Sequence, residues 1–412
     1  MAAVLAFLAG AASASVADDA PALKRFHQAR FAATLSTGGV DSVSGADVGT
    51  DLQPVQLPHV WRGGPAPGVG RHRFEFTWLP TQQDLAVLLE ATTVHVTVFL
   101  NGQEVGHTAA DPYAAPPMRS WKASPRFSLP ATLLRTGFNT LEVASHVAPS
   151  GAAGLGPVWI GASAAIDRAE LRILLRDTIA PLVIAAVIIT LGLFALVLAR
   201  NQPDRSLFIL FGVGALVWGV HTAVTLLPEQ PLPNPHYRSL WYAGYVWFVV
   251  ALSVFCTRFA ERRWRPFERV GIAAAVLALP LMYLLSAMHA PGIAYGLVLA
   301  GCIVYALVAL SAVVRFAVER RDIDGWLLLM VALMSLGFSI YDWVLNNVLQ
   351  QLLKAFFLTP YAGLAFIVLA GWILVERYQR TANAYRRLSL DLERRVRAAQ
   401  SELLERLDEV QH

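Results

Sequence analysis

Aromatic and basic residues lie close together in the N-terminal third of the sequence, in a combination that suits the binding of a small molecule. Aromatic side chains offer flat apolar faces, while Arg and His supply charge and hydrogen-bond donors. These residue types predict a site for a carbohydrate or a small acid, formed by His59, Trp61, Arg62, Arg71, Arg73 and Trp121. The loop Gly63–Gly70 beside Trp61 is its expected exposed part. The alternative is core packing inside a β-domain for Trp61, Trp78, Trp121 and Trp159.

No catalytic motif accompanies these residues. The sequence has no pair of carboxylates in a recognisable glycosidase context, so hydrolysis is not expected of this region. We therefore predict a binding function, with no catalytic residue, no metal and no cofactor.

Two ionisable residues stand inside long apolar segments. His221 lies about 15 residues into one segment and Asp342 about 16 residues into another, which at about 1.5 Å per residue gives the same depth. Ionisable groups in a membrane are costly and usually face a cavity or a partner, so we predict that His221 and Asp342 pair. The alternative places Asp342 at the outer membrane interface, solvated beside Tyr341 and Trp343.

The stretch that must position this pair reads as a seven-helix transmembrane domain over residues 178–376. Its composition fits, because 56% of the whole chain is hydrophobic, 15% is charged and the mean hydropathy is +0.49. A membrane helix needs about 20 mostly apolar residues. The predicted spans are roughly Thr178–Ala199, Ser206–Leu227, Ser239–Phe259, Val270–Met288, Gly292–Phe316, Trp326–Asn346 and Ala355–Val375.

Arginines predict the orientation of these spans. The breaks after the first, third and fifth spans are rich in arginine, whereas those after the second, fourth and sixth hold only Arg238 and Lys354. Short cytoplasmic loops carry the positive excess, which places the N-terminal part outside and the C-terminus inside the membrane. The net charge of +4 follows mostly from these loops and the tail, so we expect lipid contact and no nucleic-acid partner.

The part before the spans divides into three predicted segments. Residues 1–20 have the apolar run and small-residue cleavage sites of a signal peptide, the alternative being an ordinary apolar N-terminus. Residues 21–165 predict an extracytoplasmic β-sandwich that binds the ligand, because short alternating runs such as Val94–Leu100 are separated by turn residues. Asn101-Gly102 predicts a tight hairpin. Residues 166–177 form a juxtamembrane connector.

The tail, residues 377–412, predicts a cytoplasmic signalling coiled coil. Its apolar residues repeat every 11 positions, which gives a nearly straight helix with one apolar seam. The seam is formed by Tyr385, Leu388, Leu392, Val396, Ala399, Leu403, Leu407 and Val410. We predict a parallel homodimer along this seam, and the alternative is a lone amphipathic helix on the membrane surface.

Several runs in the N-terminal part carry a resemblance to a known module. They are Leu57-Pro58-His59-Val60-Trp61, Val94–Gly106, Phe127–Pro130 and Gly137–Val143. They resemble the galactose-binding-type jelly roll, which occurs as the non-catalytic sugar-binding domain of family 2 glycosidases. The whole chain is also similar to bacterial seven-transmembrane receptors with diverse intracellular signalling modules, in which such a jelly roll is the external domain.

This resemblance implies a signal-transducing receptor of a bacterial inner (plasma) membrane, whose cytoplasmic tail feeds an output domain. Leu390–Leu404 resembles the helical lead-in to a histidine kinase, so the expected output is a kinase that acts on a response regulator. The chain itself contains no phosphoacceptor motif and no ATP-binding glycine box. Two other classes stay open, a transporter or channel subunit with an external substrate-capturing cap, and a membrane-anchored glycosidase or other enzyme.

Overall fold

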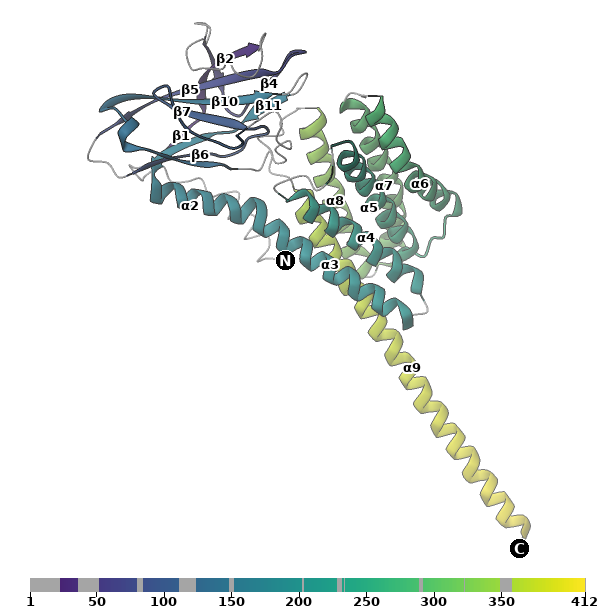
Figure 1. Ribbon diagram of the computed structural model, residues 1–412. Coiled ribbons are helices and arrows are strands. Elements are labelled where there is room, and N and C mark those ends of the chain that lie inside the picture. The colour runs from purple at the N-terminus through teal and green to yellow at the C-terminus, as the bar shows by residue number, and fades with distance from the viewer. Residues whose placement is uncertain are drawn as a thin grey trace.

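The computed structural model describes residues 23–35, 52–79, 84–110, 124–147, 152–201, 204–227, 232, 234–288, 292–321, 323–348 and 358–411. An N-terminal β-sandwich is followed by a bundle of apolar helices, and α9 extends from the bundle to the C-terminal end (Figure 1). The predicted signal peptide and Trp121 lie outside the described residues.

In its described residues, the β-domain contains three antiparallel sheets. The first has the strand order β1 (Leu23–Phe26), β12 (Val158–Ala162), β6 (Leu85–Leu89), β9 (Arg126–Leu129). The second has the order β3 (Gln53–Gln56), β2 (Gln28–Leu35), β5 (Gly68–Trp78), β10 (Gly137–Val147), β7 (Val96–Leu100), β8 (Gln103–His107). The third pairs β11 (Ala152–Leu155) with β4 (His59–Arg62), and a short helix, η2, spans Ala131–Leu133.

The core of the sandwich follows from alternation along the strands. Every second side chain of β5, β7 and β10 points into the sandwich. Of these, Phe74, Val98 and Leu141 pack against Val87 and Val158 of the four-stranded sheet. The predicted hairpin is confirmed, because Asn101 and Gly102 have φ values of 52° and 86° and join the paired strands β7 and β8. Both residue types accept positive φ, which this two-residue turn requires.

Two strands of the four-stranded sheet, β6 and β12, are buried along their whole length because both of their faces are covered. One face joins the sandwich core, and the other packs against helix α2 (Ser163–Leu174). Ala86, Leu88 and Trp159 of the sheet meet Ile166 and other apolar residues of α2 in this contact. The predicted connector is therefore helical, and it begins at Ser163 as part of the β-domain.

A long helical rod joins the β-domain to the bundle. Helix α2 continues through the π-helical turn η3 (Leu175–Ile179) into α3 (Ala180–Leu198), so the chain is helical from Ser163 to Leu198 (Figure 1). The other elements are η4 (Ala199–Asn201), α4 (Arg205–Thr225), α5 (Asn234–Phe259), α6 (Arg265–Ala287), α7 (Gly292–Arg320), α8 (Ile323–Asn347) and α9 (Thr359–Gln411).

Six helices in the described part of the chain are long and apolar enough to cross a membrane, which is typical of a multi-pass membrane protein. They match the first six predicted spans, although the first of them also includes α2. The apolar first part of α9, Thr359–Ile373, is shorter than these six. The seventh span therefore stays a prediction.

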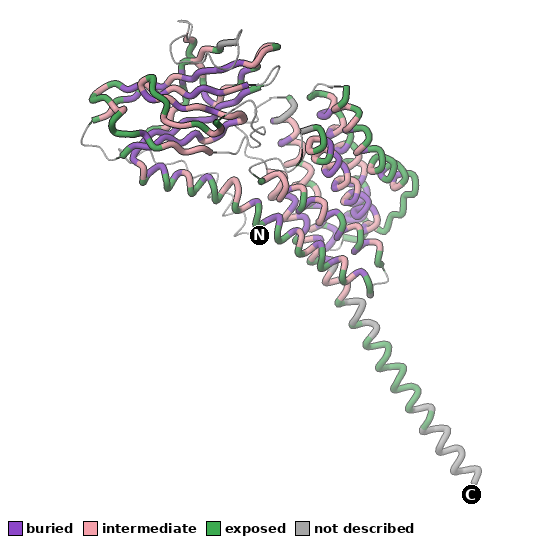
Figure 2. The backbone as a smooth tube through the Cα atoms, in the orientation of Figure 1, coloured by how far each residue is buried: buried purple, intermediate pink, exposed green. Residues whose placement is uncertain are grey.

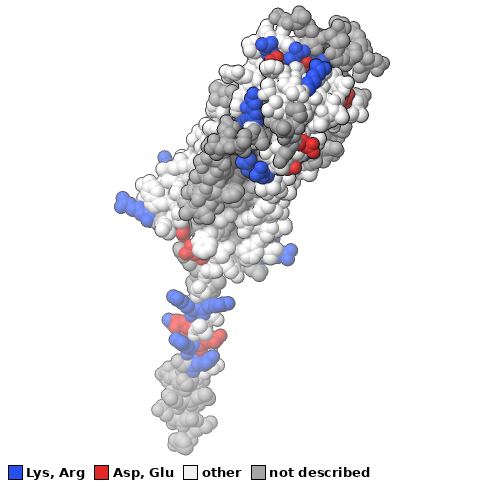
Figure 3. Space-filling model, turned by 90° about the vertical axis from the view of Figure 1, so that its left-hand side faces the viewer, with Lys and Arg blue, Asp and Glu red and all other residues white. Residues whose placement is uncertain are grey.

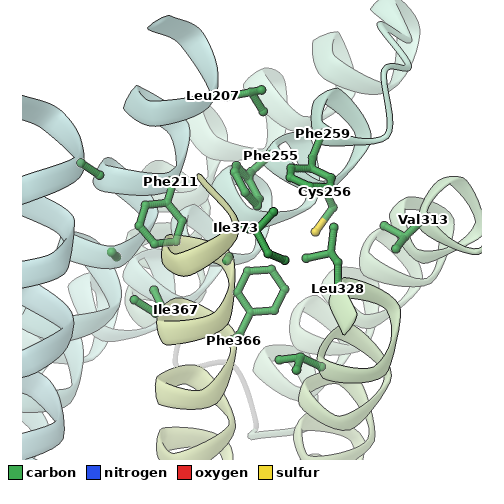
Figure 4. Packing of buried hydrophobic residues seen from close by; sticks show 14 of the residues in the cluster. Leu207, Phe211, Phe255, Cys256, Phe259, Val313, Leu328, Phe366, Ile367 and Ile373 are labelled. Atoms are coloured by element: carbon green, nitrogen blue, oxygen red, sulfur yellow. The ribbon is translucent and has the colours of Figure 1, made fainter. Parts of the chain in front are cut away.

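The interior of the bundle is a cluster of aromatic and aliphatic residues. Phe211, Phe255 and Phe366 come from α4, α5 and α9 and lie together with Ile373 (Figure 4). The outward faces of the helices are apolar but exposed, as Val276 and Leu297 illustrate. Figure 2 shows exposed residues, in green, along the helices of the bundle. Helices that are apolar on their outer faces suit a lipid environment. Figure 3 shows charged side chains on the β-domain and on the tail, and few charged side chains on the described surface between them.

Candidate functional site

Three charged residues form a compact network on the outer face of the six-stranded sheet. Glu142 on β10 lies directly across from Arg73 on β5 and from Phe99 on β7. Arg73 Nη2 lies 2.7 Å from Glu142 Oε1, whereas Arg71 Nη1 lies 3.7 Å from Glu142 Oε2. Arg71 also covers the Phe99 ring at 5.7 Å. Two cations therefore share one carboxylate here, and the structure brings the predicted residues Arg71 and Arg73 together.

The same face continues with polar residues that the sequence analysis did not select. Thr97 Oγ1 lies 3.0 Å from His146 Nε2, and His95 Nδ1 lies 3.2 Å from Thr108 Oγ1. Burial lowers the pKa of His146 to about 4, with His95 and Arg71 acting in the same direction and Glu104 opposing them. A search for polar residues at alternating positions of adjacent strands would have found this face.

The structure gives the other predicted residues of this site different roles. Trp61 is 7% exposed and packs with Val147 and Ala153, so the core-packing alternative describes it and its indole face is not a surface platform. The part of the expected loop from Gly68 to Gly70 is buried in strand β5. Arg62 is exposed at the end of β4.

His59 belongs to a histidine pair with a fully buried partner. Its Nδ1 lies 3.0 Å from Nε2 of His72, and the Phe31 ring lies within 5 Å of both imidazoles. Burial lowers the pKa of His59, and burial together with His59 lowers that of His72 to about 3. Both rings are therefore neutral at physiological pH, and an N–H of one ring donates a hydrogen bond to the bare nitrogen of the other.

The lowered pKa of His72 predicts acid sensitivity of the β-domain. Below about pH 6.5 His72 becomes protonated in the unfolded chain but stays neutral in the folded domain. The stability present at neutral pH is therefore lost as the pH falls. We expect His72 alone to lower the free energy of unfolding by about 2 kcal/mol between about pH 6.5 and pH 5. Denaturant unfolding of the full chain in lipid nanodiscs, followed by fluorescence, measures this slope. His72→Gln should flatten it, whereas Thr77→Val, which changes no titratable group at an exposed position of β5, should leave it unchanged.

Asp342 holds the start of α9. It is only 8% exposed, and its carboxylate accepts hydrogen bonds from the backbone N–H groups of Leu358 at 3.1 Å and Thr359 at 2.8 Å. The Thr359 hydroxyl donates to the same carboxylate. A carboxylate suits a helix N-terminus, because it satisfies donors without partners inside the helix and interacts favourably with the helix dipole. Asp342 thus joins α8 to α9.

His221 has different neighbours. Its ring stacks on Trp218 with centroids 5.3 Å apart and lies 4.9 Å from the Trp241 ring. Within the described parts of the chain, the contacts of His221 and those of Asp342 involve different residues. Their direct pairing stays a prediction, and the aromatic neighbours of His221 and the capping role of Asp342 were not foreseen.

A second contact connects α9 to the rod. The Tyr361 hydroxyl donates a hydrogen bond of 3.3 Å to the carbonyl oxygen of Arg176, in the π-helical turn between α2 and α3. Arg176 in turn pairs with Asp177 at 2.8 Å. The first turn of α9 therefore contacts both α8 and the rod that carries the β-domain.

The tail part of α9 exposes an apolar strip. Leu388, Leu392 and Val396 are each more than half exposed, and together they line an open groove along the helix. Salt bridges between residues four positions apart, such as Arg395 with Asp391, support the helix on other positions. The side chains of Ala399, Leu403 and Leu407 lie outside the described set.

Comparisons with known proteins show partial matches only. No protein-family model and no curated protein matches the chain. Solved structures with a similar part include a β-glucuronidase of Faecalibacterium prausnitzii (18% identity, 31% of this chain and 22% of that one, TM-score 0.23). A β-glucuronidase from an uncultured Clostridium matches with 12% identity over 35% of this chain and 30% of that chain, with a TM-score of 0.26. The present chain thus spans less than a third of either enzyme.

Proposed function

We propose that this protein is a transmembrane signal-transducing receptor in which the β-domain binds a small ligand and α9 carries the response to the C-terminus. The observation that supports this most is the set of contacts at the start of α9. There, Tyr361 contacts the rod that packs on the β-domain, and Asp342 contacts α8. A displacement of the β-domain would reach α9 through packed helices and hydrogen bonds, without a flexible link.

The sequence supplies the finer details of the proposed receptor. The β-domain would be a jelly roll outside a bacterial inner membrane, and the first part of α9 would complete seven spans. The tail would form a parallel dimer along the strip of Leu388, Leu392 and Val396, and it would feed an output domain such as a histidine kinase with a response regulator as its target. The resemblance to seven-transmembrane receptors with intracellular signalling modules supports this arrangement.

Disulfide cross-linking of the tail tests both the dimer and the coupling. In a variant with Cys256 and Cys302 replaced by alanine, we expect Leu392→Cys to form a disulfide between copies and Arg394→Cys not to form one. Adding Ile166→Ala, which removes a fully buried contact between α2 and the sheet, should change the cross-linking rate at position 392 by about threefold or more. The reason is that the rod packs on the β-domain at one end and contacts α9, which forms the tail.

The matched control is Leu171→Ala, because Leu171 lies on the exposed side of the same helix. Equal cross-linking at positions 392 and 394 would contradict the dimer strip. Equal rates for the Ile166 and Leu171 variants would contradict coupling from the β-domain to the tail.

A further inference from the structure

A wide groove with an excess of positive charge lies at one edge of the β-domain. It has a volume of about 510 Å³ and is formed where β1, β2 and β3 meet β5. Its charged lining consists of four cationic side chains and one carboxylate, those of Lys24, Arg25, Arg30, Arg73 and Glu75. Phe26, which is partly buried, adds apolar surface, and the buried Phe74 lies beneath it. The groove thus combines positive charge with aromatic contacts.

Two arginines of the groove lie on neighbouring strands, where their like charges repel each other. Arg30 on β2 lies directly opposite Arg73 on β5 in the strand register, and like charges at such positions destabilise a sheet. The carboxylate nearest to Arg73 is Glu142, which Arg71 also approaches. Because Glu142 serves two arginines, it compensates only part of this charge.

The two remaining cations of the groove differ, because only one of them has a carboxylate partner in the described part of the chain. Arg25 pairs with Glu90 at 2.7 Å, and Lys24 lies over the Phe26 ring at 4.7 Å. Among the described residues, no carboxylate forms an ion pair with Lys24 or Arg30. An anion in the groove would remove the repulsion between Arg30 and Arg73 and give Lys24 a partner.

We propose that this groove binds a small dicarboxylate. One carboxylate would bridge the guanidinium groups of Arg30 and Arg73, whose planar donor sets match carboxylate geometry. The second would lie near Lys24, while the aliphatic part of the ligand contacts the partly buried Phe26. The proposal deepens the receptor function and rests on it only for the consequence of binding, because it selects an acid over a neutral carbohydrate as the ligand.

Titration calorimetry with the full chain in nanodiscs tests this ligand class. The probes are malonate, succinate and glutarate, and the control is succinamide, which has the skeleton of succinate without its charge. We expect at least one dicarboxylate to bind, with an affinity that falls as salt is added, and succinamide not to bind. Arg30→Gln and Lys24→Gln should each raise the Kd about tenfold, because each removes one charged contact.

Arg135→Gln is the matched control variant, since Arg135 is exposed on the same domain and outside the groove. Thermal melts establish that each variant is folded. Absence of dicarboxylate binding, equal binding of succinamide, or equal weakening by Arg135→Gln would overturn the proposal. The receptor function would survive that result if Ile166→Ala still altered cross-linking at position 392, so the two failures are distinguishable.

Discussion

Replacing Asp342 by alanine is expected to lower the free energy of unfolding of the helical bundle by about 3 kcal/mol and to release the first turn of α9. The carboxylate accepts three hydrogen bonds, from the backbone N–H groups of Leu358 and Thr359 and from the Thr359 hydroxyl. Alanine leaves these donors without an acceptor at a position where little water reaches. Asp342→Asn keeps one acceptor oxygen and should lose about half as much stability.

Denaturant titration in nanodiscs measures the free energy, and hydrogen exchange measures release of the helix start. Amide protons of Leu358 and Thr359 should exchange faster in the alanine variant, while those in the middle of α9 keep their protection. The control is Tyr341→Ala, because Tyr341 is the exposed neighbour of Asp342. If the Tyr341 variant is destabilised as much as Asp342→Ala, capping is not the reason for the loss.

Gly70→Val is expected to destabilise the β-domain by about 3 kcal/mol or more. A Cβ atom on Gly70 would lie only 2.4 Å from Nε1 and Cε2 of the buried Trp61 indole, so either the indole or strand β5 must move. The measurement is the unfolding transition of the β-domain in the full chain. Thr77→Val, an exposed site on the same strand, should change stability little.

A double-mutant cycle tests whether the steric overlap with Trp61, or instead the backbone conformation at position 70, requires glycine. Trp61→Ala alone should cost about 4 kcal/mol, because it leaves a cavity in the core. In its presence, Gly70→Val should cost much less than in the parent chain. Additive effects would show that contact with Trp61 does not explain the glycine.

Local patterns predicted most of the elements because each one reflects a single chain segment. The alternation in Val94–Leu100 and the turn at Asn101-Gly102 required no knowledge of the rest of the molecule. Long apolar runs likewise predicted the first six membrane-type helices to within a few residues, apart from the rod, which begins in the β-domain. Arg71 and Arg73 lie on one sheet face because residues two apart in a strand share a side.

Contacts between distant segments were harder to predict. Nothing in Leu85–Leu89 reveals that α2 covers its second face, and nothing near Trp61 reveals that Gly70 of another strand lies against its ring. Asp342 was recognised as a costly residue, but its acceptor role depends on the position of Leu358 and Thr359 across a turn. The residue type alone was enough to single out Asp342, whereas its hydrogen-bond partners depend on the tertiary fold.

The packing of α2 on β6 and β12 decides how the β-domain can be produced as a soluble fragment. Cutting the chain after Ala162 would place Ala86, Leu88 and Trp159 in water as a flat apolar strip, which favours self-association. A fragment that ends near Leu174 keeps the strip covered, and its last turns carry Arg168 and Arg172 for solubility. For crystallisation or library display, the practical domain boundary therefore lies inside a continuous helix.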